Sequence, residues 1–244
     1  MSGHSKWATI KRQKGITDNK RGQLFTKLAN AMTIAVKMGG GNIDPNFNAT
    51  LRISVDKAKA ANMPKDSIER AIQKGAGGHG GVELEEVLYE GFAQGGVGIL
   101  VEAVTDKKQR TVAEVKNILE KNGATLAGQG AVSYLFKKAG EIIISKNGKS
   151  SDDILLIAME NSVSDMEEDG DIAIFFTEPS DLQLVKKSVE ESGLVVTDAA
   201  LIYKPSTFMS VLAEVEEKVV SLIEKLEELD DVQKVYTNLE FSSQ

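Results

Sequence analysis

The stretch EIIISKNGKSSDDILLIAME, residues 141–160, places a strand and a helix in close succession. We interpret 141–145 as the strand and 151–160 as the helix. The alternation continues directly afterwards, so we also expect a strand at 171–177, a helix at 181–192 and a strand at 194–203. Strands and helices that alternate in this way predict a ferredoxin-like sheet with helices on one face.

An acidic cluster within this unit allows two interpretations. Glu167, Glu168, Asp169 and Asp171 offer the hard oxygen ligands that Mg²⁺ and Ca²⁺ prefer. The cluster lacks the spacing of a calcium-binding loop, however, and Gly170 suits a turn that requires a positive φ. We therefore expect a solvated turn before a strand rather than a metal site.

The segments on both sides of this unit are predicted to belong together. Strand-like runs lie at 87–92, 98–105, 131–136 and 232–236, and helical runs lie at 109–122 and 208–229. The last helix and strand cannot bury a core alone, so they most simply complete the unit that begins near residue 82. The sequence thus predicts a discontinuous α+β domain, 81–132 plus 205–244, split around an inserted ferredoxin-like α+β domain, 133–204.

Residues 1–80 are predicted to form a basic all-helical domain of three helices, preceded by a flexible N-terminal tail. The apolar residues of the first helix recur at helical spacing: Leu24, Leu28, Ala31, Met32 and Ala35. The third helix opens at Pro64 and directs Ile68, Ala71 and Ile72 inward. Glycines between residues 75 and 81 read as a hinge, because no phosphate-binding glycine pattern is present.

The second helix of this domain is expected to begin at Asp44. Asp44 suits the N-cap, and Pro45 suits the first helical position. Its apolar stripe is then formed by Phe47, Leu51, Val55 and Ala58. Together with the two domains above, this gives a multidomain α and α+β fold class.

The charge of the chain is unevenly distributed. Residues 1–80 hold 14 Lys+Arg and 5 Asp+Glu, a net charge of +9, whereas residues 81–244 hold 15 and 31, a net charge of −16. A polyanion is therefore attracted to the first third of the chain and repelled by the rest. The alternative is that the basic part docks on the acidic part. The candidate nucleic-acid-binding residues are His4, Lys6, Trp7, Lys11, Arg12, Lys14, Lys20, Arg21, Lys27, Arg52 and Lys59.

Composition argues against most other function classes. The chain has no cysteine and only two histidines, His4 and His79, so thiolate metal sites and a Ser-His-Asp triad find no support. The longest apolar run, 154–159, is far shorter than the about 20 residues of a membrane span. The opening MSGHSKW lacks the apolar stretch of a secretory signal. We expect a soluble cytoplasmic protein without a catalytic site, cofactor, metal or small-molecule substrate.

Several motifs resemble the YebC family across nearly the whole chain: GHSKWATIKRQK at 3–14, DNKRGQLFTKLANAMTIAVKMGGG at 18–41, DKAKAANMPKDSIERAIQKGAGG at 56–78, YEGFAQGGVGILVEAVTDKKQRT at 89–111 and LEELDDVQKVYTNLEF at 226–241. The resemblance implies three domains, with a ferredoxin-like third domain inserted in the second. It also implies DNA-binding transcription regulation in the bacterial cytoplasm. Some relatives act instead on the ribosome, where they help synthesis through proline-rich stretches. The sequence departs from the family pattern at 107–110, where Asn-Arg-Asn-Arg is common, and at Tyr134, where Trp is common.

The sequence leaves three ways to use this charge pattern. Duplex DNA binding is supported by the many cations, but only Asn46 and Asn48, which precede Arg52, resemble the start of a base-reading helix. Ribosomal RNA binding suits a basic tail in which Trp7 can stack on a splayed base. Binding of a basic protein by the acidic domains is the third. We expect a nucleic-acid-binding regulator of gene expression, with ribosome-associated translation regulation as the alternative.

Overall fold

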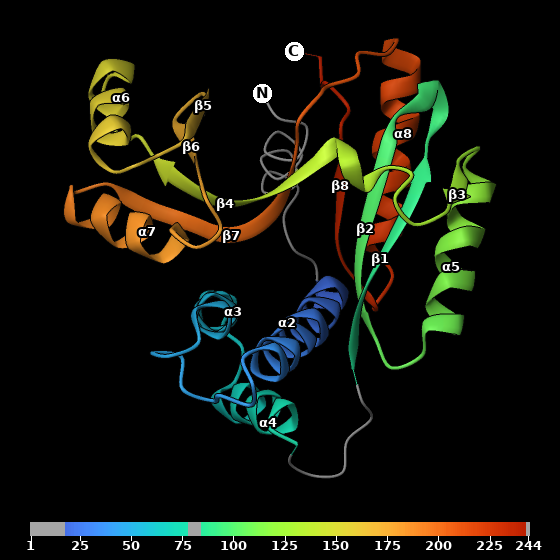
Figure 1. Cartoon of the computed structure of the whole chain (residues 1–244), viewed down its shortest axis with the longest axis horizontal. Coiled ribbons are helices and arrows are strands. Elements are labelled where there is room, and N and C mark those ends of the chain that lie inside the picture. The colour runs from blue at the N-terminus through green and yellow to red at the C-terminus, as the bar shows by residue number, and fades with distance from the viewer. Residues whose placement is uncertain (1–17, 78–83, 243–244) are drawn as a thin grey trace. The chain divides into compact units, whose positions relative to one another are not determined.

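The computed structural model describes residues 18–77 and 84–242, with side chains from Arg21 onward (Figure 1). The described residues divide into two compact units. The main unit comprises 18–133 and 211–237, and the inserted unit comprises 134–210 and 238–242. The three-domain boundaries expected from the sequence, at 80/81, 132/133 and 204/205, stay predictions.

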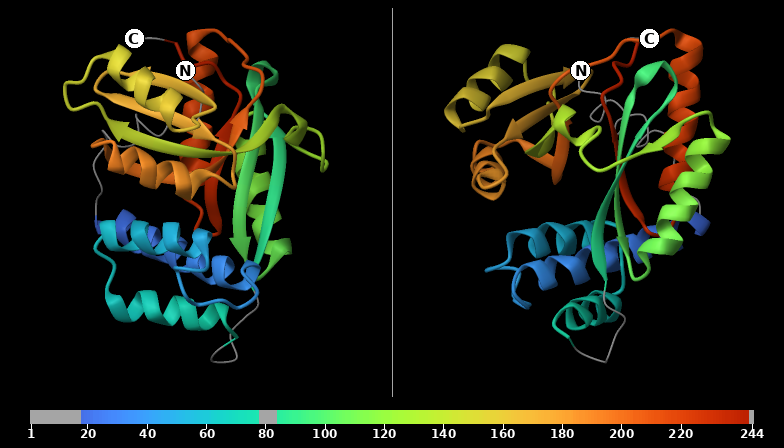
Figure 2. Two further views of the ribbon diagram at one scale, coloured as in Figure 1. Left: turned by 60° about the vertical axis from the view of Figure 1, so that its left-hand side comes forward. Right: turned by 45° about the vertical axis from the view of Figure 1, so that its right-hand side comes forward.

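The main unit begins with three helices, α2 (Asp18–Met38), α3 (Ala49–Ala60) and α4 (Lys65–Gly75). The long helix α2 lies beside both α3 and α4 (Figure 2). Most expected inward positions of the first and third helices are confirmed, because Leu28, Met32 and Ile68 are buried in one shared apolar core. Ala31 is the exception, since it is only half-buried and lies outside that core. Residues spaced three or four apart share one face of a helix, which is why these stripes meet.

The expected start of the second helix was wrong. Residues 45–47 form a turn, and α3 begins at Ala49 with Asn48 as its N-cap. The side-chain oxygen of Asn48 accepts from the backbone N–H of Leu51 at 3.0 Å, and its amide nitrogen donates to the carbonyl of Ala35 at 2.9 Å. Asn48 therefore joins α3 to α2 while it caps α3. Phe47, expected in the apolar stripe, is instead 80% exposed.

A four-stranded antiparallel sheet forms the rest of the main unit. Its order is β3-β1-β2-β8, from β1 (Glu85–Phe92), β2 (Gly98–Thr105), β3 (Thr125–Ala127) and β8 (Val232–Thr237). The helices α5 (Lys108–Lys121) and α8 (Ala213–Glu227) contact each other and the sheet. The late strand β8 pairs directly with the early strand β2, so the last helix and strand do complete the unit that begins before the insertion.

Two segments near the insertion differ from the expectation. Residues 131–136 do not form one strand; Ser133–Leu135 is a short 3-10 turn, and β4 starts at Phe136. The buried carboxylate of Glu90 explains the difference, because it accepts the backbone N–H groups of Gly130, Val132 and Ser133. These N–H groups are consequently unavailable to a neighbouring strand. The helix expected at 208–229 is shorter in the structure, where it spans Ala213–Glu227.

The inserted unit confirms the ferredoxin-like prediction. Its elements are β4 (Phe136–Ser145), α6 (Ser151–Glu160), β5 (Asp165–Asp169), β6 (Ile172–Thr177), α7 (Leu182–Glu191) and β7 (Val195–Pro205). The chain order βαββαβ produces an antiparallel sheet of order β5-β6-β4-β7. Ile142, Ile144 and Phe175 are fully buried within this unit.

The interpretation of the acidic cluster was right for the turn at Gly170 and wrong for the residues before it. Instead of a solvated turn, Asp165–Asp169 forms the edge strand β5, and Gly170 (φ 57°) makes the turn into β6. Lysines offset the poor strand propensity of this acidic segment: Lys146 pairs with Glu168, and Lys204 pairs with Asp165. The hydrogen bond from Lys146 lowers the pKa of the Glu168 carboxyl. Among the described residues there is no group of His, Cys, Asp and Glu that could hold a metal ion.

Candidate nucleic-acid interface

The first turns of α2 carry two of the candidate cations. Lys20 lies on α2, and its side chain is outside the described residues. Arg21 is exposed, and it has no hydrogen-bond or ion-pair partner among the residues that the structure describes. Its guanidinium is therefore available for a phosphate, with no described contact to break first.

Lys27, one and a half turns further along α2, is already used inside the main unit. Its side-chain amine donates to the carbonyl of Glu227, and Gln23 donates to the carbonyl of Glu228 at 3.2 Å. Both carbonyls lie at the C-terminal end of α8, where the last helical turn leaves acceptors without intrahelical partners. A lysine at this end also complements the negative pole of the helix dipole. Lys27 is thus a docking residue rather than a free cation.

Arg52 is also held within the fold. Its Nε donates to the carbonyl of Pro45 at 2.9 Å, and its Nη2 donates to the carbonyl of Asn46 at 2.9 Å. This fork of two hydrogen bonds fixes the turn that precedes α3. Asn48, its neighbour in the expected base-reading group, is buried as the helix cap. Arg52 and Asn48 therefore stabilise the loop before α3, whereas Asn46, the third member of that group, is exposed.

Lys59 is exposed in the last turn of α3 and has no partner among the described residues. The structure adds a cation that the sequence analysis did not single out, the exposed Lys74 in the last turn of α4. Its neighbours on α4 are engaged: Lys65 pairs with Glu69 at 3.5 Å, and Arg70 donates to the carbonyl of Asp66. In the sequence, Lys74 could have been identified as a candidate only through its contribution to the positive charge of residues 1–80.

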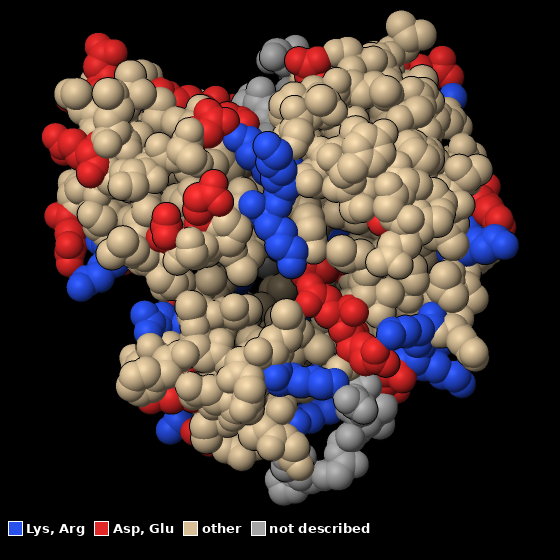
Figure 3. Space-filling view, viewed as in Figure 1, with Lys and Arg blue, Asp and Glu red and all other residues tan. Residues whose placement is uncertain are grey.

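The remaining candidates lie outside the described residues: His4, Lys6, Trp7, Lys11, Arg12 and Lys14. Arg21, Lys59 and Lys74 are thus the described cations of this segment that are exposed and have no described partner. The helices do not merge the cations into one patch on the face that Figure 3 shows, where blue side chains are interleaved with neutral and acidic ones.

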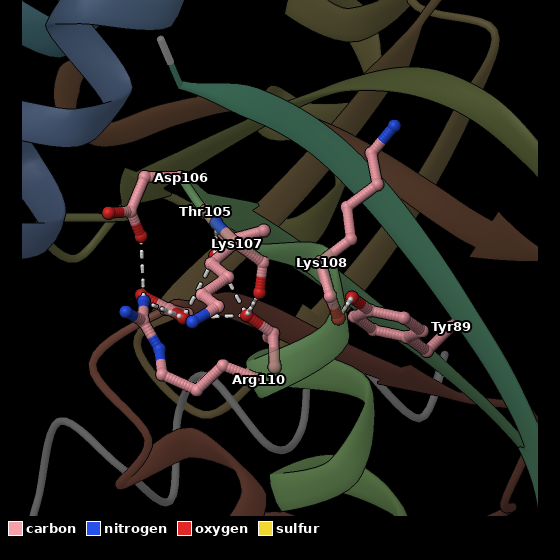
Figure 4. A network of polar contacts seen from close by, with 8 residues as sticks. Tyr89, Thr105, Asp106, Lys107, Lys108 and Arg110 are labelled. Atoms are coloured by element: carbon pink, nitrogen blue, oxygen red, sulfur yellow. Dashed lines mark hydrogen bonds and ion pairs between the residues drawn. The ribbon is translucent and has the colours of Figure 1, made fainter. Parts of the chain in front are cut away.

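The run 107–110 departs from the pattern that the sequence resembles, and it leads into a polar network at the start of α5 (Figure 4). Arg110 bonds to Asp231 at 2.8 Å and to Asp106 at 2.9 Å. Asp231 also accepts from Thr105 at 3.1 Å and from Thr111 at 2.7 Å. Burial raises the pKa of the Asp231 carboxyl, but the hydrogen bonds from Arg110, Thr111 and Thr105 outweigh it and hold that pKa below its ordinary value.

This network joins two distant parts of the main unit. Asp231 precedes β8, whereas Arg110 and Thr111 lie in the first turns of α5. Both carboxylates accept from the Nη2 of Arg110, and this pair of bonds fixes the side chain between the two loops. The network therefore links the start of α5 to the start of β8.

Among the described helices, none is both long and apolar enough to cross a membrane.

Three helices, a discontinuous α+β sheet and a ferredoxin-like insertion define a multidomain protein with a basic leading segment and an acidic body. Residues 5–78 match the TACO1/YebC protein N-terminal domain, and residues 84–239 match the TACO1/YebC second and third domain. The chain belongs to the TACO1/YebC family.

Relatives and one solved structure agree with this assignment. A probable transcriptional regulatory protein of Treponema denticola is 47% identical over 98% of this chain and 96% of its own length. One of Desulforapulum autotrophicum is 44% identical, with the same coverage. The crystal structure of a conserved hypothetical protein from Aquifex aeolicus shares the fold, with a TM-score of 0.86, 39% identity and 93% of each chain covered.

Proposed function

We propose that this protein is a non-enzymatic, nucleic-acid-binding regulator of gene expression that acts in the cytoplasm. The observation that carries the proposal is the division of charge, +9 in residues 1–80 against −16 in residues 81–244. A polyanion is attracted to the basic segment of such a chain and repelled by the acidic remainder. The similar proteins named probable transcriptional regulatory proteins make DNA the first polymer to test.

The proposed mode of binding is contact with the phosphate backbone rather than reading of base edges. Arg21 and Lys59 are exposed and without described partners, which suits contacts with phosphate oxygens. Base reading requires side chains such as Arg, Asn or Gln to project from the start of a helix. At the start of α3, Arg52 and Asn48 are held by main-chain groups instead.

A ribosome-associated, RNA-binding role in translation is the second candidate, and the same observation favours it. Structured RNA is recognised mainly through its shape, its backbone and its splayed single-stranded bases. Binding to such a target does not require a base-reading helix, so the engagement of Arg52 and Asn48 within the fold does not weaken this candidate. In this version the residues 1–80 contact ribosomal RNA, and the protein aids synthesis through proline-rich stretches.

The direct test is fluorescence anisotropy with two labelled probes, a DNA duplex of about 20 base pairs and an rRNA hairpin of similar length, from about 50 to 200 mM salt. Two charge-reversal variants address the tail and the helices: Lys11→Glu with Arg12→Glu, and Arg21→Glu with Lys59→Glu. Each should weaken binding and make the log–log salt slope on duplex DNA less steep, by about 0.9 for each phosphate that the variant no longer neutralises. The matched control, Lys121→Glu with Lys149→Glu, makes the same charge change at exposed sites of the acidic part.

Equally weakened binding in the control and in the helix variant would attribute binding to net charge alone and contradict a localised surface. Sedimentation of cell lysate then separates the two polymers. Co-migration with ribosomes that survives DNase but not high salt supports the RNA role, whereas recovery on chromosomal fragments supports the DNA role.

A further inference from the structure

Helix α6 of the inserted unit is apolar on more than its buried side. Its sequence, SDDILLIAME, buries Ile154 and Ala158 against the unit. On the outer side, Leu155 is 45% exposed, Leu156 is 59% exposed and Met159 is 72% exposed. A helix that is apolar all round is normally covered on all sides, and contiguous exposed apolar residues mark interaction sites.

The exposed residues form one stripe, here called the α6 stripe, which consists of Leu155, Leu156 and Met159. Met159 follows the two leucines by four and three positions, so the three side chains are neighbours on the helix surface. The helix that carries them is well formed. Ser150 accepts from the backbone N–H of Asp153, and Asp153 in turn accepts from the backbone N–H of Ser150, which together make a capping box. The stripe is thus a fixed feature of the fold and not the result of an unwound end.

Acidic side chains border the α6 stripe. Asp152 lies one turn before Leu155 and Leu156, Glu160 lies one turn after Leu156, and both are exposed. Figure 3 shows acidic side chains around an uncharged surface in the region where Figure 1 draws α6. The charge of the surrounding unit has the same sign, since residues 134–210 contain 14 Asp+Glu and 7 Lys, a net charge of −7.

The exposed apolar residues and their acidic border together favour one kind of binding partner for the α6 stripe. A second copy of the chain would place the same carboxylates face to face around a shared axis, which is unfavourable. Anionic lipid and nucleic acid are repelled by the same acidic border. We propose that the α6 stripe docks a positively charged amphipathic helix of another protein, whose apolar side covers Leu156 and Met159 and whose cations face Asp152 and Glu160.

The test uses the full chain and synthetic helical peptides of about 18 residues, or five turns. The first peptide has leucines on one side and lysines on its flanks, the second carries glutamates in place of the lysines, and the third carries serines in place of the leucines. The first should bind at least about ten-fold more tightly than either of the others, since it alone matches both the apolar and the charged features. In ¹⁵N-labelled protein, the amide signals that shift should be those of α6.

Two variants separate the apolar from the electrostatic part of the interaction. Leu156→Gln with Met159→Gln should weaken binding of the first peptide by about ten-fold or more. Asp152→Asn with Glu160→Gln should weaken it by a smaller factor and reduce its dependence on salt. The control Leu212→Gln changes a leucine that is 80% exposed outside the inserted unit, and it should bind as the wild type does.

Equal binding of the lysine and glutamate peptides would overturn the proposed charge selection. Wild-type affinity in the Leu156→Gln, Met159→Gln variant, with an unchanged circular dichroism spectrum, would overturn the proposed site. Concentration-dependent dimerisation that this variant abolishes would assign the stripe to a second copy and equally overturn the proposal.

Discussion

The side-chain amine of Lys27 donates a hydrogen bond to the carbonyl of Glu227, two hundred positions further along the chain. The contact joins the basic helix α2 to the acidic helix α8 within the main unit. Docking between basic and acidic parts, which is the competing explanation of the charge pattern, therefore does occur. It uses Lys27 and leaves Arg21 exposed, so this docking does not occupy the residue for which we propose nucleic-acid binding.

This division of roles predicts that one substitution on α2 lowers stability and that another weakens nucleic-acid binding. Lys27→Met keeps the apolar stem but removes the hydrogen bond at the end of α8, and it should lower the free energy of unfolding by about 1 kcal/mol. Arg21→Met removes an exposed cation and should leave stability within about 0.5 kcal/mol of wild type, while it weakens binding to DNA and RNA. Urea unfolding measures the first effect, and fluorescence anisotropy measures the second. Unchanged stability in Lys27→Met, or unchanged binding in Arg21→Met, would contradict this division.

Glu90 should make an unusually large contribution to the stability of the main unit. Its buried carboxylate accepts N–H groups of Gly130 and Ser133, both at 2.8 Å, and of Val132. Glu90→Gln keeps the shape but turns a fully accepting group into one that is partly a donor, so buried N–H groups lose their partner. The free energy of unfolding at neutral pH should fall by about 1.5–3 kcal/mol. Urea unfolding of both proteins measures this difference.

The effect of Glu90→Gln should depend on pH in a defined direction. Burial raises the pKa of the Glu90 carboxyl, but the N–H groups of Gly130, Val132 and Ser133 outweigh burial and hold that pKa below its ordinary value. A carboxyl whose pKa is lower in the folded protein stabilises the fold above its unfolded-state pKa, and this stabilisation is lost as the pH falls through the folded-state pKa. The difference between wild type and Glu90→Gln should therefore be largest near neutrality and shrink in acid. A difference that grows in acid would contradict the direction of this shift.

Much of the fold follows from local patterns, because the deciding residues are close in sequence. The helical spacing of Leu28 and Met32 predicted the buried face of α2, and the order of apolar runs predicted the ferredoxin-like insertion. The edge strand β5 has no such pattern. It forms because Lys146 and Lys204, which come from separate strands and loops, neutralise its carboxylates. Tertiary contacts of this kind override local propensity and leave no signal within the segment itself.

The candidate site was less predictable than the fold for a related reason. Arg52 and Lys59 look equally available in the sequence, yet Arg52 is bound to the carbonyls of Pro45 and Asn46 and Lys59 is exposed. The partners are main-chain carbonyls, which every residue carries, so no residue type marks them. Sequence can count the cations of residues 1–80, but only the packed structure separates those held inside the fold from those that face outward.

The polar network before β8 should behave as a coupled unit. Asp231→Ala leaves the buried hydroxyls of Thr105 and Thr111 without their carboxylate partner, and it should cost about 2–3 kcal/mol of stability. Arg110→Ala should cost about 1 kcal/mol or less, because Arg110 is substantially exposed. The double variant should cost less than the two single costs combined, since both remove the same 2.8 Å hydrogen bond. A double-mutant cycle in urea measures the difference, and strict additivity would show that this hydrogen bond contributes nothing.

Two glycines in the helical segment should respond to alanine in opposite ways. A Cβ at Gly75, the last residue of α4, would lie 2.6 Å from the carbonyl oxygen of Thr33 and 2.7 Å from the Cβ of Val36, both on α2. Gly75→Ala therefore forces α4 away from α2 and should cost about 1–3 kcal/mol. Gly22 lies inside α2, and among the described residues nothing outside the nearby helix backbone comes within 4 Å of the added carbon. Gly22→Ala should therefore stabilise the protein by about 0.5–1 kcal/mol.

Thermal and urea unfolding of the two alanine variants measure these opposite changes side by side. The same substitution in the same segment controls for the loss of backbone entropy that alanine brings in the unfolded chain. Because Thr33 also donates its hydroxyl hydrogen to the carbonyl of Ala71 at 3.0 Å, displacement of α4 by Gly75→Ala should increase amide exchange in α4 and not in α8. Stabilisation by both substitutions would mean that α2 and α4 are further apart in solution than the packing at Gly75 requires.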